Sequence, residues 1–123
     1  RLLHAGAVSP KAYADWLSRA DILPVCSRHD FFGQSVVEAL HAGLRPLLPD
    51  ALAYPEHLPL QHPASWRYAP GGFAEALEDL LVRWPEAVAE QARLHPAMKA
   101  HLEARYSWPV LAPGYDAHFG GNA

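Results

Sequence analysis

The sequence has a single cysteine, Cys26, and no long hydrophobic run. One cysteine excludes an internal disulfide and favours a reducing compartment, so we expect a cytoplasmic protein. The apolar runs fall far short of the roughly 20 residues that a membrane-spanning helix needs. The sequence also lacks a Walker-type phosphate loop and a G-x-G-x-x-G fingerprint, so it carries no motif of a P-loop NTPase or of a dinucleotide-binding enzyme.

Basic residues are few as well. Ten Lys and Arg stand against 13 Asp and Glu, for a formal net charge of −3. A free-standing nucleic-acid binder is normally basic, so this balance argues against one and leaves RNA contact only through another domain. The eight histidines lack the spacing and the cysteine company of a structural zinc site, so we expect no metal.

The chain has 123 residues, half of them hydrophobic, which suits one domain with a core of its own. We assign residues 1–105 to that domain and residues 106–123, aromatic and then Gly-rich, to a C-terminal tail. Leu2 to His4 resemble the end of a buried strand. Because no Met precedes this strand, we expect an N-terminal part of the protein to be missing.

Strand-like and helix-like segments alternate along the chain. Strands are predicted at 2–4 and in the stretches ILPV, LRPLLP and WRYA, and helices from Pro10, over 35–42, over 72–83 and from Pro85 to about Arg105. This alternation predicts an α/β fold, a Rossmann-like parallel sheet with helices on both faces. In such sheets ligands bind at the carboxyl ends of the strands.

The stretch RHDFFGQSVVEALHAG follows the ILPV strand and opens a helix. A helix N-terminus offers unpaired N–H groups and the positive end of a dipole, which bind phosphate readily. Gly33 would let a ligand approach the backbone closely, and Ser35 could cap the helix or bind a phosphate oxygen. Asp30 and Glu38 flank these amides, an arrangement that suits a polyhydroxylated ligand with a diphosphate.

Plainer interpretations of the same residues stay open from the local sequence alone. Asp30 could be a turn residue, and Glu38 could be a solvent-facing helix residue. Phe31 and Phe32 could be core side chains. His29 could donate to a sugar or could simply lie exposed in the turn.

The stretch HDFFGQSVVEALHAGLRPLLPDALAYPEHLP resembles the donor-site segment of retaining glycosyltransferases of the GT-B type. That family carries E-x(7)-E within the frame E-G-F-G-x-x-x-x-E-A-x-x-x-G-x-P. Along this frame the chain has Asp30, Phe31, Phe32, Gly33, Glu38, Ala39 and Gly43, and Pro46 follows Gly43. The resemblance is closest to the tRNA-queuosine α-mannosyltransferase branch, which has a similar H-E-F-F-G start and a Y-P-E turn. The later YSW, residues 106–108, resembles the C-terminal signature of the broader family.

This resemblance implies a partial C-terminal domain of a GT-B fold that binds a nucleotide sugar, with no separate cofactor and no metal. The implied contacts are the sugar for Asp30, Phe31, Phe32 and Gly33, the diphosphate for Gln34 and Ser35, and the nucleotide ribose for Glu38. Asp30 departs from the family, because its side chain is one methylene shorter than the usual glutamate. It keeps the charge and reaches less far.

The implied reaction transfers a sugar with retention, mannose from GDP-mannose in the closest branch, with queuosine in tRNA as the acceptor. The acceptor-binding half of such enzymes is a separate N-terminal domain, and tRNA would be contacted through it. Because that half is not in this chain, we expect no transfer by the chain alone. Two alternatives stay open: a related transferase for a glycan or lipid, and a doubly wound binding module without transferase activity.

Overall fold

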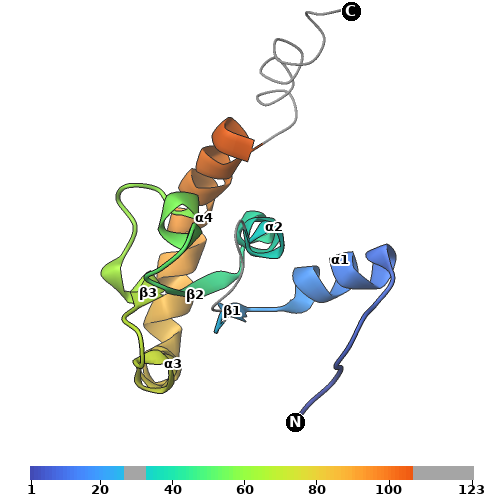
Figure 1. Cartoon of the computed structure of the whole chain (residues 1–123), viewed down its shortest axis with the longest axis horizontal. Coiled ribbons are helices and arrows are strands. Elements are labelled where there is room, and N and C mark those ends of the chain that lie inside the picture. Colours follow the sequence, from blue (N-terminus) through green and yellow to red (C-terminus); the bar gives the residue numbers. More distant parts are fainter. Residues whose placement is uncertain (27–32, 107–123) are drawn as a thin grey trace, which may run out of the picture.

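A computed structural model describes residues 1–26 and 33–106 (Figure 1). The elements in chain order are α1 (Pro10–Arg19), β1 (Ile22–Pro24), α2 (Gln34–Ala42), β2 (Arg45–Pro49), η1 (Tyr54–His57), η2 (Ala64–Trp66), β3 (Arg67–Tyr68), α3 (Phe73–Val82) and α4 (Trp84–Tyr106), where η marks a 3-10 turn. The strands form one sheet in the order β1-β2-β3, and both pairs are parallel. The predicted α/β class is confirmed.

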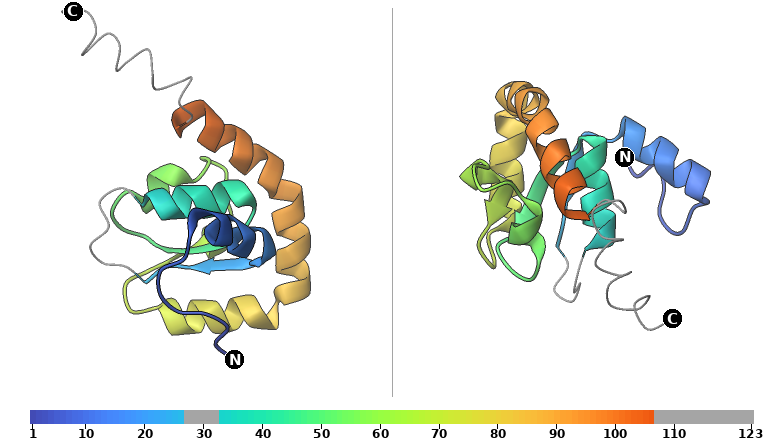
Figure 2. Two further views of the ribbon diagram at one scale, coloured as in Figure 1. Left: turned by 90° about the vertical axis from the view of Figure 1, so that its right-hand side faces the viewer. Right: turned by 90° about the horizontal axis from the view of Figure 1, so that it is seen from above.

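Helices cover both faces of this small sheet. α2 lies over one face and α3 lies against the other, as the left view of Figure 2 shows. α4 runs from α3 to α2 past the place where α2 ends and β2 begins. There the Gln91 amide donates to the carbonyls of Gly43 (3.0 Å) and Leu44 (3.3 Å), and the His95 Nε2 lies 3.0 Å from the carbonyl of His41. These contacts satisfy carbonyl groups at the helix end that have no partner inside the helix.

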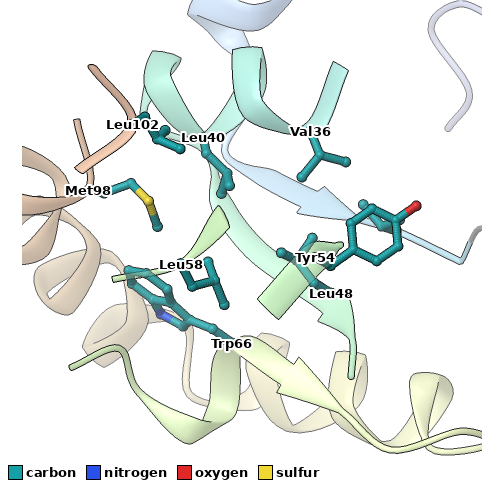
Figure 3. Close-up of a cluster of buried hydrophobic side chains, with 9 residues drawn as sticks. Val36, Leu40, Leu48, Tyr54, Leu58, Trp66, Met98 and Leu102 are labelled. Carbon is teal, nitrogen blue, oxygen red and sulfur yellow. The ribbon is translucent and has the colours of Figure 1, made fainter. Parts of the chain in front are cut away.

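Between the layers lies one cluster of buried apolar side chains (Figure 3). Its members are Val25, Val36, Leu40, Leu48, Tyr54, Leu58, Trp66, Met98 and Leu102. They come from the end of β1 (Val25 directly follows it), from β2, from the helices α2 and α4 and from the segment between β2 and β3, so the cluster joins parts of the chain that are far apart in sequence. Such burial is the main favourable term in folding.

β2 is the central strand, yet it contains Pro46 and Pro49, which have no N–H to donate. Alternate residues of the strand face alternate neighbours: the Arg45 N–H donates toward β1, and the Asp50 N–H donates toward β3. Pro46 therefore faces β3 before the pairing of β2 with β3 begins, and Pro49 faces β1 beyond its last paired residue. Pro46 thus lies where the ladder needs no donor, whereas Pro49 leaves the β1-side carbonyl opposite it without a backbone donor.

The hydroxyl of Tyr68 supplies the donor that Pro49 lacks. It donates to the carbonyl of Val25 at 2.5 Å, the group that an N–H at position 49 would face in this register. Tyr68 thereby connects β3 across β2 to the end of β1. Burial raises the pKa of the Tyr68 hydroxyl, and the nearby Cys26 and Tyr54 add to the shift.

One predicted strand is absent. Leu2 to His4 form no strand, and Leu2 and Leu3 are 80% and 61% exposed. A short apolar run becomes a strand only where a neighbouring strand can pair with it, and none of the described residues offers that pairing. The sheet therefore has three strands where we predicted four.

The other predicted elements are confirmed, with ends that differ by one or two residues. Ser9 caps α1 by accepting a hydrogen bond from the Ala12 N–H at 3.2 Å. Gly43 ends α2 in the left-handed conformation. α4 continues through Tyr106, the residue at which we placed the start of the tail, and residues 107–123 lie outside the described part. None of the described helices is long and apolar enough to cross a membrane.

Gly43→Ala should destabilise the fold more than Gly71→Ala. Both glycines have a positive φ, +102° and +83°, so each alanine costs about 1–3 kcal/mol of backbone strain. A Cβ on Gly43 would also lie 3.2 Å from the His95 ring, whereas a Cβ on Gly71 would meet nothing within 4 Å. Urea unfolding of the two variants measures the difference, and equal losses of unfolding free energy would contradict the role of this packing.

Candidate functional site

The first turn of α2 lies at the carboxyl end of the sheet, where the sequence predicted a phosphate site. α2 begins at Gln34, and Gly33 is its N-cap with φ 75° and ψ 47°. No side chain of the described residues caps this end, and the Val37 N–H donates to the Gly33 carbonyl at 3.0 Å. An N-terminus of this kind presents backbone N–H groups and a positive partial charge.

Gly33 is buried. The sequence predicted that the missing side chain leaves room for a ligand, and in the structure this space faces Tyr54 and His57. A Cβ at this position would lie 3.0 Å from Cε1 of Tyr54 and 3.5 Å from Nε2 of His57. The space that the glycine leaves open therefore takes the edge of the Tyr54 ring. The positive φ is a second reason for glycine, because other residues adopt it at a cost.

Tyr54 and His57 belong to η1, and both are fully buried. The His57 Nδ1 lies 2.8 Å from the hydroxyl of Tyr106 at the end of α4. The His57 ring meets the rings of Tyr54 and Tyr106 edge to face, with centroids 6.5 and 5.3 Å apart. These three residues tie η1 and the end of α4 to the first turn of α2. Sequence reasoning used Tyr54 only as part of a motif and missed His57; the Y-P-E-H stretch gave no signal of this packing.

Gln34, Ser35 and Glu38 share the exposed side of α2, away from the sheet. The Gln34 amide donates to the Glu38 carboxylate at 3.4 Å. Glu38 follows just past the first turn, as predicted for a helix that begins here, and it stays within reach of the same helix end. The structure thus brings Gly33, Gln34, Ser35 and Glu38 together at one end of one helix.

Tyr13 of α1 also contacts Glu38. Burial raises the pKa of the Tyr13 hydroxyl, and the hydrogen bond to Glu38 and the charge of that carboxylate raise it further. Glu38 and Tyr106 line a hollow of about 290 Å³ between α2 and α4. In the same hollow the His41 ring contacts Glu103 at 2.9 Å, and this hydrogen bond lowers the pKa of the Glu103 carboxyl.

A second hollow, of about 660 Å³, lies at the carboxyl ends of all three strands. Its lining residues are Cys26, Pro49, Ala51, Leu52, Tyr68, Pro70, Gly71, Phe73 and Ala74. The sequence pointed to this edge of the sheet and not to this hollow, which contains none of the predicted site residues. We assign no ligand to it.

Three predicted sugar-binding residues, Asp30, Phe31 and Phe32, lie outside the described residues, as does His29. Their roles stay predictions. Within residues 1–26 and 33–106, no three His, Cys, Asp or Glu side chains gather closely enough to hold a metal ion.

The chain is similar to a tRNA-queuosine alpha-mannosyltransferase of Drosophila melanogaster. The two are 32% identical over 62 residues, which are 50% of this chain and 16% of that relative. No family model and no solved structure matches the chain. The similarity supports a relation to glycosyltransferases, and the chain spans about one sixth of the length of the relative.

Glu38→Gln should lower the pKa of Tyr13. The substitution removes the carboxylate charge that opposes ionisation of the phenol, while burial of Tyr13 remains. The pKa should therefore fall toward 10.0, the ordinary value, and stay above it. Ultraviolet titration of tyrosinate, with Tyr13→Phe made in both backgrounds to isolate the Tyr13 signal, measures the shift. An unchanged pKa would mean that Tyr13 and Glu38 do not interact in solution.

Proposed function

We propose that this chain is the donor-binding half of a retaining glycosyltransferase that moves mannose from GDP-mannose to queuosine in tRNA. The observation that carries the proposal is the similarity to the Drosophila mannosyltransferase. The order of residues from Asp30 to Pro46, which resembles the donor-site frame of GT-B enzymes, supports it. The parallel sheet with a helix start at its carboxyl end is the kind of structure that binds nucleotides.

In this proposal the first turn of α2 binds the diphosphate. The backbone N–H groups of Gln34 and Ser35 lie in that turn, and no described side chain occupies them as a cap. Phosphate oxygens accept from such groups and are favoured by the helix dipole. The same donors would stabilise the negative charge that develops on the departing GDP, which is how this half would contribute to the reaction.

Glu38 would hold the ribose. Its carboxylate lies on the exposed side of α2, so it can accept hydrogen bonds from two neighbouring hydroxyls. Gln34 and Tyr13 contact the same carboxylate and hold it near the helix start. Asp30, Phe31, Phe32 and Gly33 would face the mannose, as the family frame implies.

Glu38→Ala should weaken GDP binding more than tenfold, because a hydrogen bond to a charged group contributes about 1.5–3 kcal/mol. Isothermal titration of GDP into the folded variant measures this loss. Glu78→Ala is the matched control, since Glu78 is an exposed glutamate on α3, against the other face of the sheet. Unchanged GDP affinity in Glu38→Ala would mean that Glu38 faces solvent without binding the ribose. Failure of the wild-type chain to bind GDP would contradict the proposal.

Sugar transfer should need more than this chain. The proposal places the acceptor and tRNA contacts in an N-terminal half, so the purified chain should bind GDP-mannose without turning it over. Release of GDP from GDP-mannose in the presence of queuosine-containing tRNA provides the assay. Turnover by the chain alone would contradict this division of roles.

A further inference from the structure

The hydroxyl of Tyr54 is buried and has no hydrogen-bond partner among the described residues. The whole side chain is inaccessible to solvent, with 0% exposure. Nearly all buried polar groups in folded proteins are paired, because an unpaired one loses its bonds to water without replacement. A buried hydroxyl without a partner therefore needs a physical explanation.

This hydroxyl lies beneath the first turn of α2. Cε1 of Tyr54 is 3.0 Å from the Cβ position of Gly33, and Cε1 is the ring carbon next to the one that carries the hydroxyl. Figure 3 shows the phenolic oxygen at the outer edge of the cluster, beside the end of β1, with Val36 of α2 above the ring. Gly33 is the N-cap of α2, so the Tyr54 ring lies next to the end of the helix at which no described side chain caps the N–H groups.

The Tyr54 ring is held firmly in this position. Leu48 and Leu58 belong to the same buried cluster, and the His57 ring lies edge-on to it. His57 is in turn held by the Tyr106 hydroxyl. The direction of the Tyr54 hydroxyl is thus set by packing, and turning it toward another partner would disturb the core.

We infer that the Tyr54 hydroxyl is a donor for an anionic phosphate oxygen bound at the first turn of α2. The inference rests on the proposed function, which places a diphosphate there. A phenol adds one O–H donor to the backbone N–H groups of the turn, and a bond from it to a charged oxygen is stronger than one between neutral groups. Shielding from water strengthens such a bond further, so the ligand supplies the partner that the hydroxyl otherwise lacks.

Tyr54→Phe should therefore have two opposite effects. Without ligand, the variant should be more stable than the wild type, because it removes an unpaired buried hydroxyl and keeps the ring. Its thermal midpoint should rise by about 4 °C or more. With ligand, it should bind GDP and inorganic pyrophosphate about tenfold more weakly, because a donor to a charged oxygen is lost.

Tyr68→Phe is the matched control, since it removes a hydroxyl that has a partner, the Val25 carbonyl. This variant should lose stability and keep the wild-type affinity for both probes. Differential scanning calorimetry without ligand and isothermal titration with GDP and with pyrophosphate provide the two measurements. GDP and pyrophosphate share the diphosphate, so equal fold-losses for the two probes would place the effect on the phosphates.

The outcomes separate this inference from the proposed function. A more stable Tyr54→Phe that binds both probes weakly supports the inference. Wild-type affinity in Tyr54→Phe would overturn it and leave the diphosphate site in place. A Tyr54→Phe variant that is less stable than the wild type would also overturn it, because the hydroxyl would then have a structural partner. A wild-type chain that binds neither probe would overturn the proposed function and the inference together.

Discussion

The contact between the Gly33 backbone and the edge of the Tyr54 ring is the constraint on which the candidate site depends. At 3.0 Å from the missing Cβ, the ring leaves room for glycine and for no other residue without movement. The positive φ at the same position turns the chain into α2. Because η1 carries Tyr54 and His57, and Tyr106 holds His57, the place where α2 starts is set by elements that are distant in sequence.

α2 is held in the same way at its other end. Gly43 packs against His95, and Gln91 and His95 of α4 lie against the last carbonyls of the helix. With both ends fixed and its inner side buried, α2 is a rigid support for the exposed groups at its start. A site that binds a diphosphate benefits from such rigidity, since donors that are already in place need little reorganisation when the ligand arrives.

The sheet beneath α2 is small. Its central strand, β2, contains two prolines, which is unusual for a central strand. Pro46 and Pro49 are tolerated because of the staggered ends of β1 and β3, and Tyr68 replaces a missing backbone donor. Because both strand pairs are parallel, the carboxyl ends of the three strands lie at one edge of the sheet. The similarity to a mannosyltransferase supports a relation to glycosyltransferases, and the site proposed for the nucleotide sugar lies at this edge.

The sequence alone was sufficient for features that depend on neighbouring residues: the Ser9 cap of α1, the Gly43 end of α2, the three parallel strands and the family resemblance that singled out Glu38. The tertiary structure decided the rest. Leu2 to His4 look like a strand locally and have no strand to pair with. The reason for glycine at position 33, and the roles of Tyr54 and His57, come from contacts across 20 residues or more of chain. A local sequence pattern predicts on which face of a helix or strand a residue lies, whereas the residue that it contacts is determined only when the whole core packs.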